Sequence, residues 1–186
     1  MQQLINFIKK YTVLDKAAEK AVLDATSSEF FPKNEFLLKS GQYCNKIWFI
    51  KSGLIRRFYR HNSKEITIWI YDEDQWLTSA RSFFQKEPSQ EYIQACEDSE
   101  LVCISREASQ ELMHYSAIQR FSKLHLQEML ACGEKLSQEF GPLSAGEKYQ
   151  YLFEHVPTIL KRAKLGHIAS MMGVTQETLS RIRARH

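Results

Sequence analysis

The sequence predicts an α+β protein in which a region of short strands lies between helical segments. Hydrophobic residues recur at helical spacing in residues 2–28. Between residues 35 and 105 the pattern changes to short runs rich in β-branched and aromatic residues, and after residue 106 the helical spacing returns. The chain of 186 residues is 44% hydrophobic, which suits one medium domain and one small domain.

The central region predicts many short strands. Turn-forming residues separate the hydrophobic runs, as at Lys51-Ser52-Gly53. Close turn signals between short strands indicate a sandwich or a barrel. The predicted strands span residues 35–39, 46–50, 53–60, 64–70, 91–96 and 100–105.

A long helix is predicted over residues 117–140. One apolar line along it advances by three or four residues, as in a coiled-coil seam. A helix that lies on its own β domain would need the same line. A second apolar set (Leu124, Leu126, Leu130 and Phe140) favours dimerisation, because it gives the helix a second surface to contact. Gly141-Pro142 then ends the helix and forms a hinge. The predicted dimer seam consists of Ile118, Phe121, His125, Met129, Cys132 and Leu136.

The C-terminal end of the chain has the pattern of a helix-turn-helix. Ala169 is small enough for two helices to cross closely, and Gly173 suits the positive φ of a sharp turn. Thr175 can cap the second helix, whose Leu179 and Ile182 share one buried face. The pattern favours a DNA-binding motif over an ordinary helical hairpin, because the opposite face carries side chains that can bond to base edges. The predicted base-reading residues are Gln176, Glu177, Ser180 and Arg181.

The same end of the chain is strongly basic. Residues 161–186 hold six lysine and arginine residues and a single acid, Glu177, whereas the whole chain has a net charge of only +3. A local concentration of positive charge indicates contact with phosphates. The predicted phosphate contacts are Lys164, Thr175, Arg183 and Arg185.

Other functional classes have little support in the sequence. No apolar run approaches the ~18 residues of a membrane span. The first residues carry no cleavable signal-peptide pattern, so we expect a cytoplasmic protein. Because the four cysteines are scattered and the six histidines form no metal-binding pattern, we expect reduced thiols, no metal site and no cofactor.

The order of these elements resembles the Crp/Fnr family of bacterial transcription regulators. The most specific segment is residues 173–182 (GVTQETLSRI), which is similar to the turn and recognition helix of that family. The resemblance implies a β-roll, that is, a jelly-roll or double-stranded β-helix sensor domain of the cyclic-nucleotide-binding type. It also implies a homodimer that binds a palindromic operator in double-stranded DNA, with RNA polymerase as a further candidate partner. The implied domains are residues 1–116 for the sensor, 117–141 for the dimerisation helix and 142–186 for the helix-turn-helix domain.

The resemblance also locates a candidate effector pocket and indicates that it is degenerate. In cAMP-binding members of the family, a Gly-Glu pair holds the ribose and a later Arg-Ser pair holds the cyclic phosphate. Thr78-Ser79 and Ser89-Gln90 stand at these two positions. A buried cyclic phosphate needs a nearby cation, and Arg81 is the only basic residue close to these positions in the sequence. We therefore expect no cAMP binding of the usual kind. The candidate pocket residues are Trp76, Thr78, Ser79, Arg81, Ser89 and Gln90.

Two alternative functions remain open. A cupin-like metal enzyme could use the same jelly roll, but it needs histidine and acidic ligands on the strands, and only His61 falls there. An effector-independent module could instead bind a partner protein through its terminal helices. We expect no enzyme activity. Residues 155–162 leave little room for a wing before the helix-turn-helix, which predicts a short or missing one.

Overall fold

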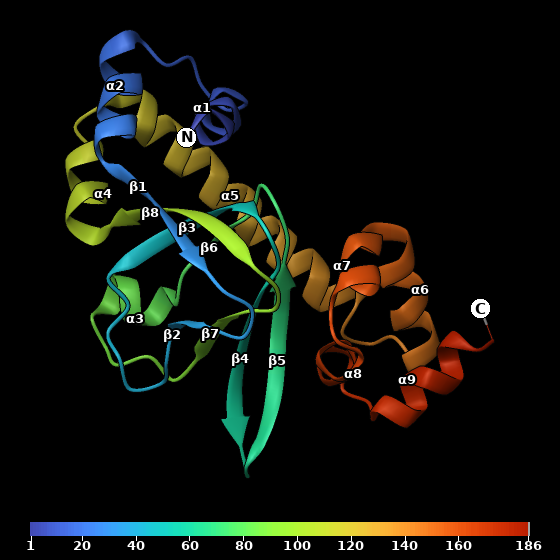
Figure 1. The fold of residues 1–186 in the computed structure, drawn as a ribbon. Coiled ribbons are helices and arrows are strands. Elements are labelled where there is room, and N and C mark those ends of the chain that lie inside the picture. Colours follow the sequence, from blue (N-terminus) through green and yellow to red (C-terminus); the bar gives the residue numbers. More distant parts are fainter. Residues whose placement is uncertain (186) are drawn as a thin grey trace.

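A computed structural model describes residues 1–185 of the protein, whose fold is shown in Figure 1. It is α+β, as predicted, and begins with two helices, α1 (Gln2–Lys9) and α2 (Lys16–Asp24). The segment of helical spacing over residues 2–28 forms two helices, and its last residues, from Thr26, belong to the first strand. The helices are separate because the side chain of Asp15 accepts a hydrogen bond of 2.7 Å from the backbone N–H of Ala18. This cap begins a new helix.

Eight strands then form two antiparallel four-stranded sheets that pack as a β-roll (Figure 1). One sheet has the order β1-β8-β3-β6 and the other has the order β2-β7-β4-β5. The six predicted strands are all present, whereas β1 and β6 were not predicted. The strands are β1 (Thr26–Phe31), β2 (Phe36–Leu38), β3 (Lys46–Ser52), β4 (Ile55–His61), β5 (Lys64–Tyr71), β6 (Trp76–Leu77), β7 (Tyr92–Ala95) and β8 (Ser99–Ser105).

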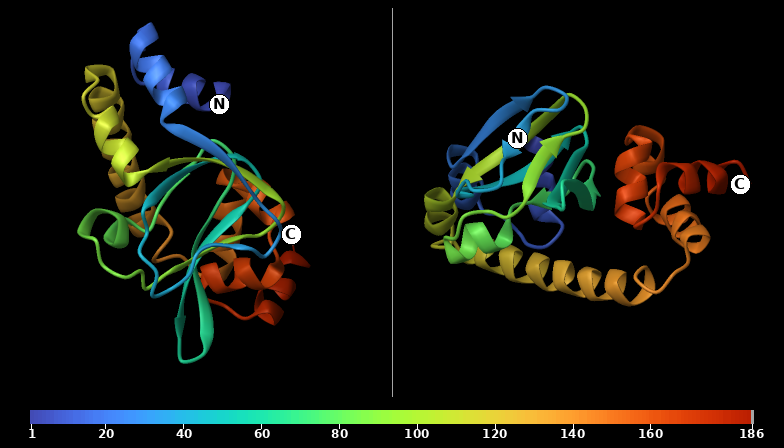
Figure 2. Two further views of the ribbon diagram at one scale, coloured as in Figure 1. Left: turned by 60° about the vertical axis from the view of Figure 1, so that its left-hand side comes forward. Right: turned by 90° about the horizontal axis from the view of Figure 1, so that it is seen from below.

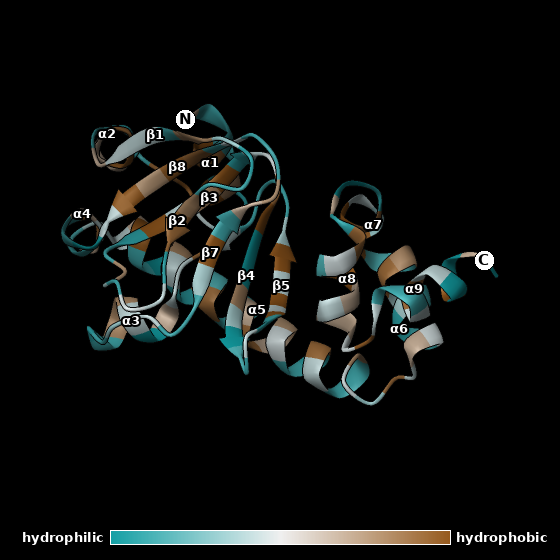
Figure 3. Ribbon diagram, turned by 60° about the horizontal axis from the view of Figure 1, so that its bottom comes forward, coloured by the Kyte–Doolittle hydropathy of each residue, from teal (hydrophilic) through white to brown (hydrophobic). Residues whose placement is uncertain are grey.

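Strand β3 contributes to two hydrophobic cores because its side chains alternate between the faces of the sheet. Ile50 lies in the core between the two sheets together with Ile93 and Leu101. Its neighbour Phe49 lies on the outer face, in a core shared with the N-terminal helices and with Phe121. Figure 3 shows the hydrophobic residues along β5 and β8, in contrast to the largely hydrophilic α9.

Three further helices lie within the β-roll or after it, before the C-terminal domain. They are α3 (Ala80–Gln85), which lies between β6 and β7, and α4 (Arg106–Leu112) and α5 (Ser116–Glu139), which follow β8. The bounds of α5 agree closely with the predicted helix over residues 117–140. Figure 2 shows α5 running past the β-roll toward the C-terminal helices.

The two halves of α5 have different surroundings. Ile118 and Phe121 are buried in the core beneath α1 and α2, and His125 lies against the same aromatic cluster. These three residues of the predicted dimer seam therefore pack inside the protomer, because the N-terminal helices cover that face. Further along α5, Met129 and Cys132 are exposed, as are Leu126 and Leu130. The last seam residue, Leu136, packs against the C-terminal core.

The C-terminal domain is a small cluster of helices. Ser144 and Glu147 form a capping box at the start of the first helix, and Pro157 begins the second. Its core contains Leu152, Ile159 and Leu179, each fully buried. From residue 106 to residue 185 the regular elements are all helices, so the structure shows no wing in that range. The four helices are α6 (Ala145–His155), α7 (Pro157–Arg162), α8 (Leu165–Met172) and α9 (Gln176–Arg183).

Candidate functional site

Helices α8 and α9 pack against each other across a sharp turn, as the predicted helix-turn-helix requires. Gly173 ends α8 in the left-handed region with φ of 74°, a conformation that costs a glycine little. The side chain of Thr175 accepts a hydrogen bond of 3.2 Å from the backbone N–H of Thr178 and so caps α9. Ala169 and Leu179 are buried in the core of the C-terminal domain. The sequence pattern and the geometry therefore agree at the turn, the cap and the buried face.

The outer face of α9 presents polar side chains to solvent. Gln176, Glu177, Ser180 and Arg181 are all exposed, and Glu177 and Arg181 stand on the side of α9 opposite Leu179. Arg183 and Arg185 are exposed at the end of the same helix. Because these groups lie together on one helix, they can enter a groove or contact phosphates without rearrangement of the domain.

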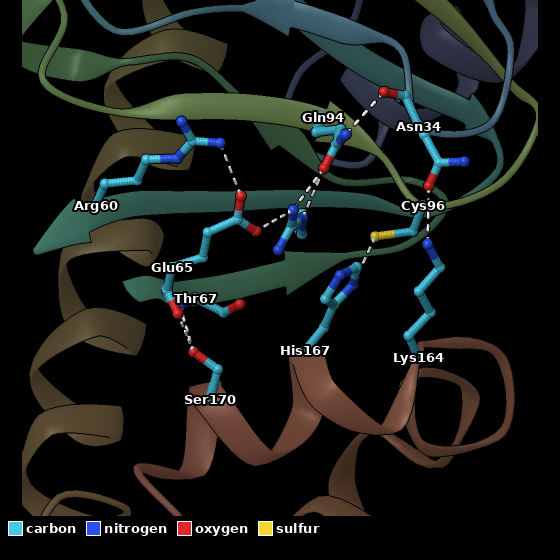
Figure 4. Close-up of polar contacts among 10 residues, drawn as sticks. Asn34, Arg60, Glu65, Thr67, Gln94, Cys96, Lys164, His167 and Ser170 are labelled. Atoms are coloured by element: carbon cyan, nitrogen blue, oxygen red, sulfur yellow. Dashed lines mark hydrogen bonds and ion pairs between the residues drawn. The ribbon is translucent and has the colours of Figure 1, made fainter. Parts of the chain in front are cut away.

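The first helix of the motif, α8, is docked on the β-roll (Figure 4). The hydroxyl of Ser170 accepts a hydrogen bond of 2.9 Å from the backbone N–H of Thr67 and donates one of 2.9 Å to the carbonyl oxygen of Glu65. Both groups belong to β5, the edge strand of its sheet. Ser170 therefore satisfies a donor and an acceptor that no neighbouring strand pairs.

A further contact in this interface joins a buried thiol and an imidazole. The Sγ of Cys96 lies 3.7 Å from the Nδ1 of His167 (Figure 4). Burial raises the pKa of Cys96 to about 11, and burial together with the nearby charges of Arg56 and Lys164 lowers the pKa of His167 to about 4. Both groups are therefore neutral at pH 7, so this pair has no thiolate nucleophile and serves as packing.

Basic residues of the C-terminal domain also bind the β-roll. Arg162 donates hydrogen bonds to Glu73, at 2.8 Å from each of two guanidinium nitrogens, and it forms an ion pair with Glu97. These bonds lower the pKa of Glu73 to about 2. Lys164 donates a hydrogen bond of 2.9 Å to the side chain of Asn34 (Figure 4). Lys164, a predicted phosphate contact, thus bonds to the β-roll in this structure.

Hydrogen bonds around the buried Arg56 support β5, the strand on which α8 docks. Arg56 is 5% exposed and donates hydrogen bonds to Gln94, at 2.9 and 2.6 Å, and to Glu65, at 2.6 Å. Gln94 in turn donates to the backbone carbonyl of Asn34 at 2.7 Å. The surface that receives α8 is therefore held in place by charge-assisted bonds within the β-roll.

A separate cavity of about 310 Å³ lies between the β-roll, the N-terminal helices and α5. Most of its lining is apolar, from residues such as Ile8, Leu77 and Ile118. Arg57 from β4 and His125 from α5 also line it. The cavity is thus closed on one side by the same helix that continues toward the C-terminal domain.

Comparison with known proteins identifies the β-roll. Residues 28–116 match the cyclic nucleotide-binding domain family. The β-roll is a cyclic nucleotide-binding domain. No curated protein matches the chain in sequence.

Solved structures share the whole architecture. The c-di-GMP responsive global regulator CLP of Xanthomonas campestris superposes with a TM-score of 0.71 at 13% identity, over 92% of this chain and 91% of that one. FixK2 of Bradyrhizobium japonicum also gives 0.71 at 13% identity, over 86% and 83%. A protein of Eubacterium rectale assigned to the Crp/Fnr family gives 0.68 at 16% identity, over 92% and 83%. The predicted resemblance to the Crp/Fnr family is confirmed, and the chain has the architecture of these regulators.

Within the cyclic nucleotide-binding domain, the predicted pocket residues do not gather at one place. Trp76 and Thr78 line the cavity. The hydroxyls of Ser79 and Ser89 hydrogen-bond to each other at 3.1 Å, and both residues are 3% exposed. Arg81 is exposed and forms an ion pair of 2.7 Å with Glu87. Gln90 is exposed as well. By the resemblance, Ser79 stands at the position of the ribose-binding pair and Ser89 at the position of the pair that holds the cyclic phosphate, and here the two bond to each other. Arg81 does not line the cavity.

Two residues that line the cavity, Arg57 and His125, were not predicted as pocket residues. Arg57 was placed in a predicted strand, and His125 was assigned to the dimer seam. Only the fold brings β4 and α5 to the same cavity.

Residues 1–185 show neither a metal-binding cluster nor a membrane-spanning helix. No group of three or more histidine, cysteine, aspartate or glutamate residues in that range could hold a metal ion. No helix described there is both long and apolar enough to cross a membrane.

Proposed function

We propose that this chain is a sequence-specific DNA-binding transcription regulator, with the helix-turn-helix as its output and the cyclic nucleotide-binding domain as its sensor. The observation that carries the proposal is the outer face of α9, where Gln176, Glu177, Ser180 and Arg181 are exposed on a well-formed motif. The regulators with the same architecture support it.

The exposed side chains suit the reading of base edges. Arg181 can donate two hydrogen bonds to a guanine, Glu177 can accept one from a cytosine amine, and Gln176 can bond an adenine. Thr175, Arg183 and Arg185 lie at the ends of α9, where they would contact phosphates and position the helix. Lys164 would join them only after it leaves Asn34.

The regulator acts as a homodimer through α5 in this proposal. Leu126, Met129 and Leu130 are 62, 46 and 66% exposed and lie on one face of the helix, since they are spaced by three and four residues. A second copy of α5 would cover this stripe. A two-fold dimer then presents two copies of α9 to a palindromic operator.

In this proposal the protein does not bind cyclic AMP in the manner of the cAMP-binding members of the family. The cyclic phosphate would need a buried cation, whereas the serine pair Ser79 and Ser89 is neutral and Arg81 is bonded to Glu87 at the surface. No catalytic role and no interaction with RNA polymerase is needed to explain the features described above.

Selection of binding sites from a random DNA pool tests the DNA-reading function. We expect a palindromic site for the unsubstituted protein. Arg181→Ala should relax the preference at one base position by about 1–3 kcal/mol, whereas Arg183→Ala should weaken binding to all sequences alike. The assignment of α9 fails if Arg181→Ala binds the selected site as tightly and as selectively as the parent.

Analytical ultracentrifugation tests the dimer. Leu130→Glu places a charge in the exposed stripe and should give a monomer with reduced operator affinity. Ala131→Glu is the matched control, because Ala131 is exposed and its spacing from Leu126, Met129 and Leu130 places it outside that stripe. A dimer that persists in Leu130→Glu would move the interface to another surface.

A further inference from the structure

The cavity beneath α5 contains polar atoms that the protein itself leaves without partners. Among the described residues, the Nε of Arg57, the Nε1 of Trp76 and both ring nitrogens of His125 are buried and make no hydrogen bond. All three side chains line the cavity. Leaving a buried polar group unpaired costs about 1–3 kcal/mol, so several around one apolar cavity indicate a ligand that supplies the missing bonds.

Arg57 supplies the only arginine or lysine charge among the described residues that line the cavity. Its guanidinium has weak partners: the carbonyl oxygen of Thr78 lies at 3.5 Å, and the carboxylate of Glu91 lies at 3.9 Å, beyond hydrogen-bonding distance. A guanidinium carries five N–H donors and matches a carboxylate with two parallel bonds. Arg57 is therefore suited to hold one anionic group.

His125 adds a neutral polar group at the other side. Its ring stacks on Phe121 at 5.5 Å and meets Phe7 edge-on at 5.4 Å. Burial lowers the pKa of His125, so its ring is uncharged at neutral pH and can both donate and accept a hydrogen bond. The cavity thus offers a single positive charge, and it suits a ligand with a single negative charge.

The size and the lining set the rest of the ligand. A volume of about 310 Å³ holds roughly ten groups of the size of a water molecule, at ~30 Å³ each. Leu77, Ile118 and Phe121 provide an apolar wall, which excludes a sugar or a nucleotide phosphate of high charge.

We propose that this cavity binds a small apolar monocarboxylate, with its carboxylate on Arg57 and its hydrocarbon part against α5. The inference rests on the proposed sensor role of the cyclic nucleotide-binding domain and names the ligand class of that sensor. The ligand carboxylate takes the place beside Arg57 that Glu91 approaches, and the ring of His125 and the indole N–H of Trp76 provide further bonds.

Isothermal titration calorimetry with the full chain, in the absence of DNA, tests the ligand class. Octanoate and phenylacetate are the probes, since each has a carboxylate on an apolar body of suitable size, and octanamide and phenylacetamide are their neutral counterparts. We expect at least one acid to bind about ten- to a hundredfold more tightly than its amide, which is the range for a charge-assisted hydrogen bond. Equal binding of acid and amide, or no binding of either acid, overturns the proposal.

Substitutions test whether the carboxylate of the ligand binds at Arg57. Arg57→Gln should lower the affinity for the acid about tenfold or more and leave the amide unchanged. Arg81→Gln is the matched control, because Arg81 is exposed and lies outside the cavity. Glu91→Gln should raise the affinity for the acid, because it removes a competing carboxylate. If Arg57→Gln does not fold, the comparison of acid with amide and the Glu91→Gln variant still test whether the carboxylate binds beside Arg57. An acid that loses affinity in Arg81→Gln, or loses it in Glu91→Gln, contradicts the assignment.

Failure of this inference can be told from failure of the proposed function. A protein that selects a palindromic DNA site but binds neither acid remains a regulator with another effector. A protein that binds the acid through Arg57 but selects no DNA supports the ligand site and contradicts the proposed DNA-binding function.

Discussion

The Nδ1 of His167 on α8 lies 3.7 Å from the Sγ of Cys96 in the β-roll, at the interface between the two domains, where Cys96 is buried and His167 is half-buried. An imidazolium at this position would face the positive charges of Arg56 and Lys164 without being fully solvated. The docked arrangement therefore requires a neutral ring at His167, and this requirement gives it a dependence on pH.

We expect the docking of the helix-turn-helix domain to weaken as the pH falls. The pKa of His167 is about 4 when docked, against an ordinary value of 6.5, so the undocked state binds more protons between these values. Docking is at full strength above about pH 6.5 and is lost progressively toward pH 4. Small-angle X-ray scattering should show a larger radius of gyration over this window. His167→Gln should remove that part of the response, and an unchanged profile in this variant would assign the response to other groups.

The ion pair between Arg162 and Glu73 gives a second expectation. Glu73→Gln should weaken the docking by about 1 kcal/mol, because the bidentate bonds lie at the rim of the interface, where solvent screens them. Arg162, which then keeps only its ion pair with Glu97, should also raise non-specific DNA affinity, measured by fluorescence anisotropy at two salt concentrations. Glu87→Gln serves as the control, since Glu87 pairs with the exposed Arg81 away from the interface. Equal non-specific affinity in the two variants would contradict this expectation.

Ser170→Ala should destabilise the protein by about 1–3 kcal/mol, because it leaves the N–H of Thr67 and the carbonyl of Glu65 without their partner. Chemical denaturation monitored by tryptophan fluorescence measures the loss. Ser180→Ala is the matched control, since Ser180 is exposed on α9. A loss below the error of the measurement would mean that water replaces the hydroxyl.

Two glycines on helices should respond in opposite directions to the same substitution. Gly173→Ala should cost about 1 kcal/mol, because its φ of 74° disfavours a side chain although space for a Cβ is open. Gly133→Ala lies inside α5 with open space at its Cβ, so it should stabilise the helix by up to about 1 kcal/mol. Thermal unfolding of both variants checks the pair. Destabilisation by Gly133→Ala would indicate that a neighbouring molecule approaches α5 there, as a tight dimer contact would.

Much of the fold could be predicted because its elements follow local patterns. The strands of the β-roll, the bounds of α5 and the turn at Gly173 all depend on residue spacing and on turn chemistry. Strand β1 was missed because its sequence, TSSEFF, is polar and mostly faces solvent, so it lacks an alternating hydrophobic pattern. The break before α2 depends on a single cap, Asp15, within an otherwise helical pattern.

The functional site could be predicted only in part. The exposed face of α9 follows from helical spacing, and it was located correctly as a surface. The docking of Ser170 on β5 and the approach of Arg57 to α5 depend on contacts between segments far apart in the chain, which spacing does not reveal. The same is true of Lys164, whose charge indicated a phosphate contact and whose amine bonds to Asn34.

The docking of α8 on β5 also bears on the solubility of the protein. A strand at the edge of a sheet presents unpaired backbone groups that can recruit a strand from another molecule, and α8 shields this edge in the docked arrangement. When the helix-turn-helix domain moves away, α8 no longer covers the edge of β5. Any state that frees this domain therefore exposes a site for self-association, and a long-lived undocked protein should aggregate unless another molecule covers β5.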